Sequence, residues 1–295
     1  MSTTLKLSHL DKVLFPEYGV SKGDLIEHYR SVAARMLPQV HDRPMAMARY
    51  PDGIDKPSFM QQAAPNHTPS WIKTVTVPKE HGEITHLLCQ DENTLIYLAN
   101  QAAVTLHTWL ARADRPERPD QVLFDLDPPH TFSQAAHAAL ALRTLLDELG
   151  LPSLVKTTGG RGLHVHVPLV RRYDADTLRG FARGVCAVLE SREPDLYTSE
   201  MRKNKREGRL LLDISRNAYA QLVVAPYTVR ATPDARVATP LDWSELDDED
   251  LSPQRFTVQT MARRLDEPDP WDRTRMPRPV PSLSTARQRL GDLPT

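Results

Sequence analysis

Two aspartates at the end of a short apolar run are the residues of this sequence best placed to do chemistry. In the segment QVLFDLDPP, residues 121–129, Val122 to Phe124 favour a β-strand and the two prolines end it. Because side chains alternate along a strand, Asp125 and Asp127 leave from the same face. Two carboxylates this close repel each other unless a cation lies between them. The pattern indicates either a cation site or a strand end whose aspartates cap a turn.

A third carboxylate, Asp213, ends another apolar run, LLLD. If the three aspartates converge, they can hold two hard divalent cations, which align an attacking hydroxyl with a phosphate. Oxygen ligands favour Mg²⁺ or Mn²⁺, whereas zinc favours nitrogen and sulfur. His164 and His166 share a strand face and could start a zinc site, but the sequence offers no third ligand at a suggestive distance.

A glycine-rich segment and several arginines supply groups that bind phosphate. The run TTGGRGLHVHVPL, residues 157–169, allows a tight backbone whose amides can cradle a phosphate. Four arginines are candidate clamps for a triphosphate: Arg161, Arg206, Arg216 and Arg230. Between Lys156 and Arg230 basic residues outnumber acidic ones, although the whole chain has a net charge of −1. A solvated charged face is the alternative explanation of this excess.

The elements that must position these residues alternate between strands and helices, so we predict an α/β fold. Ser21 is expected to cap a helix that ends before Pro38. The segment 93–112 has the clearest helical periodicity and carries His107. Further helices are predicted over 133–150 and 176–190, with Gly150 as a stop signal.

Composition limits the class of protein. The chain has 295 residues, of which 40% are hydrophobic and 25% charged, values that are ordinary for a folded water-soluble protein. Cys89 and Cys186 share no motif spacing and are expected to be buried free thiols. No apolar stretch approaches 18 residues, and the N-terminus has no apolar core typical of a signal peptide. We therefore expect a cytoplasmic, nucleoid-associated protein without a membrane partner.

Several separated motifs resemble the polymerase domain of bacterial DNA ligase D, a member of the archaeo-eukaryotic primase superfamily. The motifs are DLDPP, TTGGRGLHVHVPL, LLLDISRN, APYTVRA, DKVLFP, RYPDGIDKPSF and LANQAAVTLHTW. The resemblance covers about residues 5–275. It implies the archaeo-eukaryotic primase fold: an RRM-like catalytic sheet packed with helices, plus an N-terminal subdomain. The corresponding division is a primase-polymerase domain over 1–276 and a polar, unpacked C-terminal tail over 277–295.

The resemblance also implies roles for particular residues of this chain. Asp125, Asp127 and Asp213 match the metal-binding catalytic aspartates, with Mn²⁺ or Mg²⁺ as cofactor. The residues matching positions that hold the incoming nucleotide are His107, Thr158, Arg161, His164, Arg206, Arg216 and Arg230. Thr158 stands where the family usually has serine, and either hydroxyl can bind phosphate.

Contacts to DNA are implied for a second group of residues. Lys12 and Lys22 match basic residues that grip a 5′-phosphate, and Phe59 matches an aromatic that stacks on a template base. His9 stands where the family often has asparagine. Ala48 stands where some members carry a phosphate-binding lysine, for which Lys56 can substitute, and Met60 replaces a second aromatic.

The implied function is a template-dependent polymerase that fills short gaps and extends ends in non-homologous end joining, with a preference for ribonucleotides. Its partners would be DNA with gaps or 5′-phosphorylated ends, NTPs or dNTPs, the end-binding protein Ku and a separate DNA ligase. Two alternatives remain open: a gap-filling polymerase or primase in excision repair, and a DNA end-bridging module without catalysis. A metal-dependent nuclease is a third.

Overall fold

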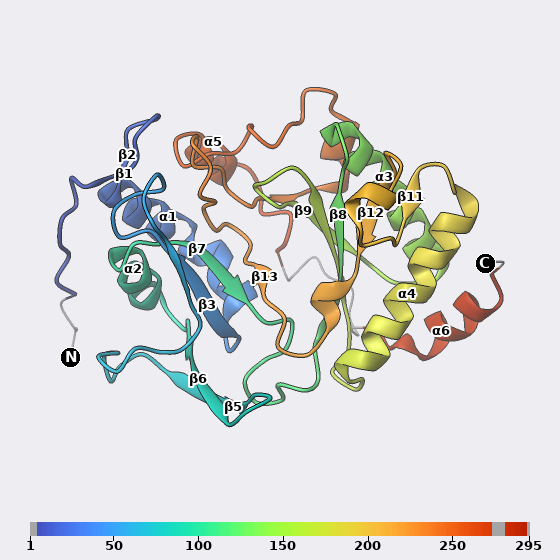
Figure 1. Cartoon of the computed structure of the whole chain (residues 1–295), viewed down its shortest axis with the longest axis horizontal. Helices are drawn as coiled ribbons and strands as arrows, with labels where there is room; N and C mark the ends of the chain where they lie inside the picture. Colours follow the sequence, from blue (N-terminus) through green and yellow to red (C-terminus); the bar gives the residue numbers. More distant parts are fainter. Residues whose placement is uncertain (1–4, 273–280, 294–295) are drawn as a thin grey trace. The chain divides into compact units, whose positions relative to one another are not determined.

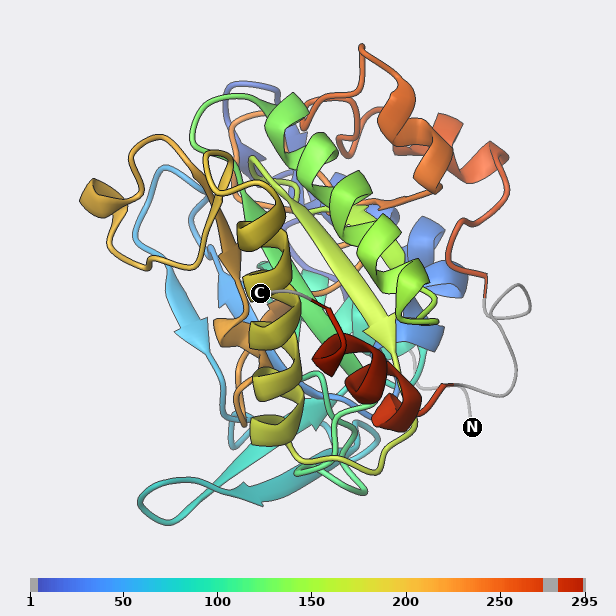
Figure 2. The ribbon, with the colours of Figure 1, turned by 90° about the vertical axis from the view of Figure 1, so that its right-hand side faces the viewer.

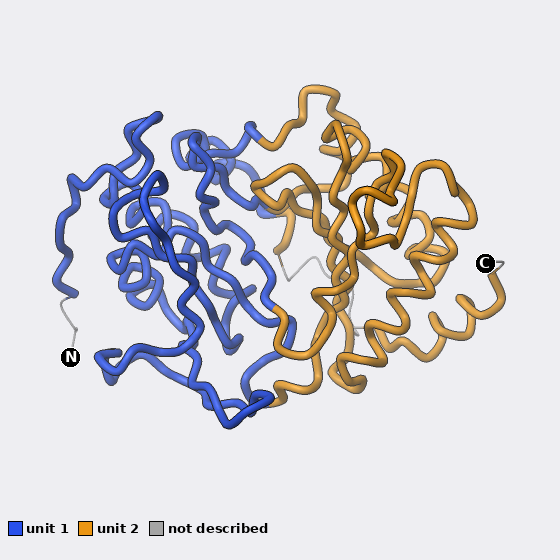
Figure 3. Tube along the Cα trace, viewed as in Figure 1, with its two compact units in different colours: residues 1–114, 222–239, 254–269 blue, residues 115–221, 240–253, 270–295 orange. Residues whose placement is uncertain are grey.

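The computed structural model describes residues 5–272 and 281–293, which form two compact units (Figure 3). Unit 1 comprises residues 1–114, 222–239 and 254–269, and unit 2 comprises 115–221, 240–253 and 270–295. Each unit builds its own sheet from segments that are distant in the sequence. No helix in the described ranges is both long and apolar enough to cross a membrane.

Unit 1 combines a small hairpin, a long helix and a sheet whose strand pairs are all antiparallel in the described residues (Figure 1). Strands β1 (Val13–Phe15) and β2 (Val20–Ser21) lead into helix α1 (Lys22–Val40). The sheet has the strand order β13-β7-β3-β6-β5, and β4 pairs with β3. Its strands are β3 (Pro44–Arg49), β4 (Phe59–Gln61), β5 (Thr74–Pro78), β6 (Glu83–Leu88), β7 (Ala103–Thr108) and β13 (Val223–Val224), accompanied by helices α2 (Glu92–Asn100) and α5 (Met261–Asp266).

Unit 2 carries the second sheet, with the strand order β11-β12-β8-β10-β9-β14. Its strands are β8 (Gln121–Asp127), β9 (Leu154–Thr157), β10 (Leu163–Pro168), β11 (Tyr197–Thr198), β12 (Leu210–Asp213) and β14 (Pro240–Leu241). The β11–β12 pair is parallel and the other pairs are antiparallel. Figure 2 shows helices α3 (Phe132–Glu148) and α4 (Ala175–Arg192) lying side by side over this sheet. The described part of unit 2 also contains three short 3₁₀ turns: η1 (Lys203–Lys205), η2 (Ser215–Asn217) and η3 (Trp243–Asp247).

The predicted start is confirmed for helix α1, whereas helix α3 starts earlier than predicted. Ser21 caps α1, and a reciprocal capping box joins it to Asp24. Pro38 lies inside the last turn of this helix, which continues to Val40, so the predicted end is wrong by a few residues. The helix predicted over 133–150 begins instead after its cap Thr131, and Gly150 follows its end with φ +74°.

The helix predicted over 93–112 is wrong for its second half. Helix α2 ends at Asn100, Ala102 adopts a positive φ of 54°, and the chain then enters strand β7. Strand β7 is paired on both sides, with β3 and β13. A short apolar run fits a doubly paired strand as well as a helix, and here tertiary pairing overrides the local helical pattern.

The prediction of an unpacked tail is wrong for the described part of the C-terminus. Residues 283–291 form helix α6 (Leu283–Gly291), whose Leu283 and Ala286 are fully buried. The Arg289 guanidinium donates to the carbonyl oxygen of Glu148 at 3.3 Å. A small apolar stripe is therefore enough to dock this polar helix on unit 2. Residues 277–280 and 294–295 of the predicted tail lie outside the described residues.

Candidate active site

The two aspartates of β8 lie on one face of the sheet, as their spacing predicts. Val122, Phe124 and Leu126 are fully buried on the opposite face. The strand register places two more side chains next to Asp125, because Asp213 of β12 and His164 of β10 are both directly opposite it. Residues directly opposite each other in antiparallel strands point to the same face. Asp213, Asp125 and His164, with Asp127 two residues along β8, form what we call the carboxylate row.

The charge of Asp125 is supported by nearby cations. Its side chain is 24% exposed, and His164 Nε2 lies 3.6 Å from its Oδ1. Burial acts to raise the pKa of Asp125, but the positive charges of His164, Arg216 and Lys156 hold that pKa below its ordinary value. Asp125 is therefore ionised at neutral pH, which a cation-binding carboxylate requires.

Asp213 and Arg216 are positioned by the short turn η2. The Asp213 Oδ1 accepts a hydrogen bond of 2.7 Å from the Ser215 amide. Asn217 ties this turn to β8: its amide group donates to the Leu123 carbonyl at 2.6 Å and accepts from the Leu123 N–H at 2.8 Å. Strand β12 ends at Asp213 and does not reach Leu123 of β8. The Asn217 side chain therefore takes the place of a partner strand for the Leu123 backbone groups. We did not identify Asn217 from the sequence, although it lies in the LLLDISRN motif.

Asp127 is held by two of the predicted arginines. Arg161 Nη2 lies 3.1 Å from Asp127 Oδ1, and Arg206 Nη1 lies 4.0 Å from Asp127 Oδ2. Arg206 also donates to the carbonyl oxygens of Glu200 and Met201, which fixes the basic loop around it. Unit 2 thus gathers a cluster of guanidinium groups beside the carboxylates, as expected for a site that binds phosphate.

The glycine-rich turn between β9 and β10 closes on Thr158. The Thr158 hydroxyl accepts from the Gly160 amide at 3.1 Å and donates to the Gly162 carbonyl at 3.1 Å. A Cβ atom on Gly162 would lie 2.1 Å from the Leu126 carbonyl oxygen, so only glycine fits beside β8. In this conformation the turn uses the Thr158 hydroxyl internally, and phosphate binding by Thr158 stays a prediction.

The donor set fits hard divalent cations, but its side chains are not gathered around one point. In residues 5–272 and 281–293, no three His, Cys, Asp or Glu side chains are placed to hold one ion. Asp127 is turned to Arg161, and Asp213 to the Ser215 amide. The three carboxylates nevertheless share one face of two adjacent strands, and oxygen ligands of this kind suit Mg²⁺ or Mn²⁺.

The histidine pair is better explained by packing than by zinc. The His166 Nδ1 lies 2.8 Å from Gln121 Oε1, and its ring meets Trp271 edge to face at 5.0 Å. The Trp271 indole in turn donates to the Val155 carbonyl at 3.0 Å. His166 therefore anchors the chain at Trp271 on the sheet of unit 2.

Two residues predicted to bind the nucleotide belong to unit 1. His107 lies on β7, directly opposite Ala46 of β3 and Val224 of β13. Arg230 donates its backbone N–H to the Arg236 carbonyl at 2.7 Å. The prediction that they share one nucleotide with the arginines of unit 2 stays a prediction.

Unit 1 also brings together the lysines predicted to contact DNA. The amides of Lys22 and Gly23 donate to the carbonyls of Lys12 and Leu10, which folds the hairpin back on the start of α1. Burial and the positive charge of the nearby Lys12 lower the pKa of Lys22. The Lys12 Nζ lies 2.6 Å from Asp52. His9 adopts a positive φ of 51° in the turn just before Lys12.

The predicted stacking residue is available at the surface. Phe59, on β4, is 48% exposed, and the Arg49 guanidinium lies 5.2 Å from the centre of its ring. Met60 beside it is also exposed, and Lys56 follows the turn at Gly53. An exposed aromatic ring beside a cation can stack on a base, and template stacking by Phe59 stays a prediction.

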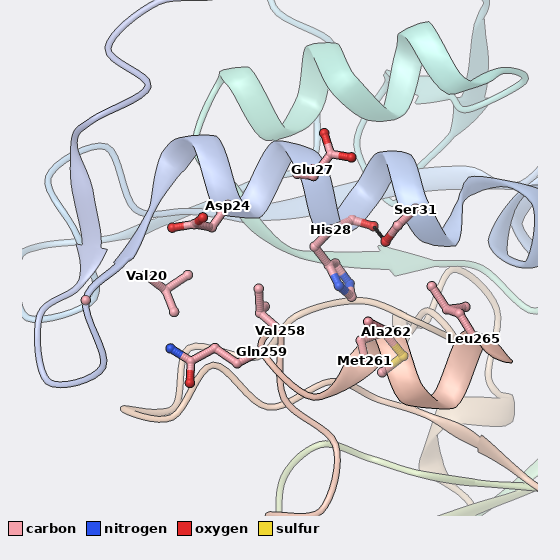
Figure 4. Close-up of a pocket in the computed structure, with 11 residues that line it drawn as sticks. Val20, Asp24, Glu27, His28, Ser31, Val258, Gln259, Met261, Ala262 and Leu265 are labelled. Carbon is pink, nitrogen blue, oxygen red and sulfur yellow. Dashed lines mark hydrogen bonds between the residues drawn. The ribbon is translucent and has the colours of Figure 1, made fainter.

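A pocket of about 500 Å³ in unit 1 lies apart from these residues (Figure 4). Its two helical walls come from α1 and from the segment around α5: Asp24, Glu27, His28 and Ser31 on one side and Val258, Met261, Ala262 and Leu265 on the other. Burial lowers the pKa of His28 to about 4, although a bond of 2.8 Å between Nε2 and the Tyr227 carbonyl opposes the shift. None of the predicted site residues lines this pocket in the described part of the chain.

Comparisons with known proteins agree with the motifs and the fold. A sequence model described as the LigD primase-polymerase domain matches residues 21–271. The chain belongs to the LigD primase-polymerase family. It is 32% identical over 97% of its length to the multifunctional non-homologous end joining protein LigD of Mycobacterium bovis. It is 30% identical over 88% of its length to the bifunctional non-homologous end joining protein LigD of Bacillus subtilis.

A solved structure extends the agreement to three dimensions. The fold is similar to that of the polymerase domain of Mycobacterium tuberculosis ligase D in complex with DNA, with a TM-score of 0.85 and 30% sequence identity. The match covers 99% of this chain and 100% of the solved chain. The fold is therefore the archaeo-eukaryotic primase fold predicted from the motifs. The chain spans 39% of the M. bovis relative and 42% of the B. subtilis relative. It thus corresponds to the polymerase part of longer LigD proteins.

Proposed function

We propose that this chain is a template-dependent nucleotidyltransferase that extends a primer 3′ end across short gaps and at broken DNA ends. One observation carries the proposal: Asp213 lies opposite Asp125, with Asp127 on the same face, in a chain of the LigD primase-polymerase family. The end-joining role of longer LigD relatives supports the same role here. Ribonucleotides are the expected preferred substrates.

Asp125, Asp127 and Asp213 are the residues that would hold two Mn²⁺ or Mg²⁺ ions. When bound, such ions neutralise phosphate charge and make the primer 3′-hydroxyl a better nucleophile toward the α-phosphate. The protein's part is to keep the carboxylates ionised on one rigid strand face. The lowered pKa of Asp125 serves this, because no proton has to be displaced at neutral pH.

The arginines of unit 2 would bind the triphosphate and the leaving pyrophosphate. Arg161 pairs with Asp127 in this structure, so phosphate oxygens compete with a carboxylate for the same guanidinium. Binding of the nucleotide to Arg161 therefore releases Asp127 for its own role. Arg206, Arg216, His164 and Thr158 are proposed nucleotide contacts in unit 2, with His107 and Arg230 in unit 1.

The hairpin and strand β4 of unit 1 would bind DNA. Lys12 and Lys22, with His9, form a basic group suited to a 5′-phosphate, because two adjacent ammonium groups gain from an anion between them. Phe59 offers an exposed ring for a template base, and Lys56 adds positive charge nearby. Ku and a separate DNA ligase are the proposed protein partners, and the cytoplasm with its nucleoid is the proposed setting.

The experiment is extension of a labelled primer across a short gap with Mn²⁺, comparing ribonucleotides with deoxyribonucleotides. Each substrate is tested with and without a 5′-phosphate on the downstream strand. We expect templated addition that favours ribonucleotides and increases with the 5′-phosphate. The matched control is Asp125→Ala, which should abolish extension while DNA binding remains.

The other outcomes separate the alternatives. Addition that ignores the 5′-phosphate would favour gap filling in excision repair or primer synthesis. DNA binding without any addition would favour an end-bridging module. Shortening of the labelled primer would indicate a nuclease. Extension that persists in Asp125→Ala would disprove the assignment of the site.

A further inference from the structure

A lysine extends the carboxylate row by one more strand. Lys156 of β9 lies directly opposite His164 of β10, which lies opposite Asp125 of β8. The side chains of Lys156, His164, Asp125 and Asp213 therefore follow one another across four adjacent strands on one face. Neighbouring strands are about 4.8 Å apart, so the Cα atoms of Lys156 and Asp125 are about 10 Å apart. The ammonium group can act on the carboxylates through space.

Lys156 differs from the other cations of the site in being enclosed. Its side chain is fully buried, and its Nζ donates to the Thr157 carbonyl at 3.3 Å. Strands β10 and β14 flank it on both sides. Arg161, in contrast, has a side chain that is 62% exposed and can turn from Asp127 to a phosphate. When a nucleotide binds, the exposed guanidinium of Arg161 can move toward its phosphates, whereas the buried ammonium of Lys156 stays in place.

A buried ammonium is costly unless an anion compensates it. The anion nearest in the row is Asp125, which lies two strands away because His164 is directly opposite both residues. The same positive charge must repel any second cation that binds to Asp125. Because the interaction scales with the product of charges, a divalent cation is repelled twice as strongly as a proton.

We propose that Lys156 is a positioning residue whose fixed positive charge weakens divalent cation binding by the carboxylate row, so that the cations are held firmly only together with nucleotide phosphates. The inference rests on the proposed metal site. It gives a reason for burying a lysine in line with Asp125 and Asp213 on the same face of the sheet. Without the nucleotide the row keeps its carboxylates ionised, and with the nucleotide the phosphate charge outweighs the lysine.

The test is a direct titration of the whole chain with Mn²⁺, following the electron paramagnetic resonance signal of free Mn²⁺ at pH 7.5 without nucleotide or DNA. Lys156→Met removes the charge and keeps the length of the side chain. We expect Lys156→Met to bind Mn²⁺ about 3- to 10-fold more tightly than the unchanged protein. Lys156→Arg should retain the original affinity. Adding a nonhydrolysable nucleoside triphosphate should tighten Mn²⁺ binding more in the unchanged protein than in Lys156→Met.

Controls separate this inference from the proposed function. Thr157→Val changes a buried neighbour on the same strand without changing charge, and should leave Mn²⁺ affinity unaltered. Asp125→Ala should weaken Mn²⁺ binding. If it does not, the proposed metal site is wrong. If Asp125→Ala weakens binding but Lys156→Met leaves it unchanged or weaker, the site stands and the role of Lys156 is wrong.

A second neutral variant guards against misfolding. Lys156→Gln keeps a polar end that can still donate to the Thr157 carbonyl, and it should show the same gain in affinity. If both neutral variants fail to fold while Lys156→Arg folds, the lysine serves stability alone and the proposal is overturned.

Discussion

The carboxylate row of unit 2 and the inner side of helix α1 in unit 1 treat buried polar groups in opposite ways. In the row, Asp125, His164 and Lys156 are brought together as interacting charges. Under α1, His28 is held neutral, and the Tyr29 hydroxyl is placed 2.7 Å from Thr228 Oγ1 and donates to the Val104 carbonyl at 2.8 Å. Burial raises the pKa of Tyr29 far above its ordinary range. The difference teaches that buried charge is kept in the row, where we propose that cations bind, and is avoided under α1, where the side chains only pack.

The largest expected effect comes from removing one charge from the row without removing its hydrogen bond. Asp213→Asn keeps an oxygen that can accept from the Ser215 amide, which spans 2.7 Å in this structure. Loss of a cation-binding carboxylate should lower primer extension by at least about 1000-fold. The melting temperature should stay unchanged, because the local hydrogen bond is retained. Extension within about tenfold of the unchanged protein would show that Asp213 is not part of the site.

Replacing Asn217, the buried amide that ties the η2 turn to strand β8, should lower the free energy of unfolding. Asn217→Leu leaves the N–H and carbonyl of Leu123 without their side-chain partner. We expect the free energy of unfolding to fall by about 3 kcal/mol, since each buried polar group left unpaired costs about 1–3 kcal/mol. Denaturation in urea measures the loss. Asn217→Asp is the matched variant, because it keeps an acceptor for the Leu123 N–H and should lose less.

The neutral histidine under α1 should make stability depend on pH. Its pKa is about 4 in the folded protein and about 6.5 when unfolded, so the folded state resists protonation. The stabilisation is complete above pH 6.5 and is lost as pH falls from 6.5 toward 4, by about 3 kcal/mol. Urea denaturation at a series of pH values compares the unchanged protein with His28→Gln. If the two proteins lose stability in parallel, His28 is not held neutral.

The smallest effect is expected at the exposed lysine of the hairpin. Lys12→Ala should leave the melting temperature unchanged, because its ion pair with Asp52 is exposed to solvent. Binding of gapped DNA with a 5′-phosphate should weaken about 3- to 10-fold. DNA without this phosphate should bind with little change, and Lys12→Arg should behave as the original protein. Equal weakening with both DNAs would assign Lys12 to general attraction of the DNA backbone.

The sequence by itself determined the features that depend on short-range periodicity. The two-residue spacing of Asp125 and Asp127 puts both on one strand face, and the capping box at Ser21 starts α1. The separated motifs were specific enough to indicate the family and its fold, which the comparisons confirmed. Cys89 and Cys186 are buried free thiols, as predicted from their apolar surroundings and the absence of a motif spacing.

Only the tertiary structure decided which distant residues become neighbours. Strand register puts Asp213, His164 and Lys156 in line with Asp125, and no local pattern contains that register. The segment around His107 has helical periodicity but is a strand, because β3 and β13 pair with it on both sides. The helix at 283–291 forms on a surface that unit 2 provides. Local preferences amount to a fraction of a kcal/mol per residue, whereas pairing and burial contribute more, and they depend on contacts that lie far away in the sequence.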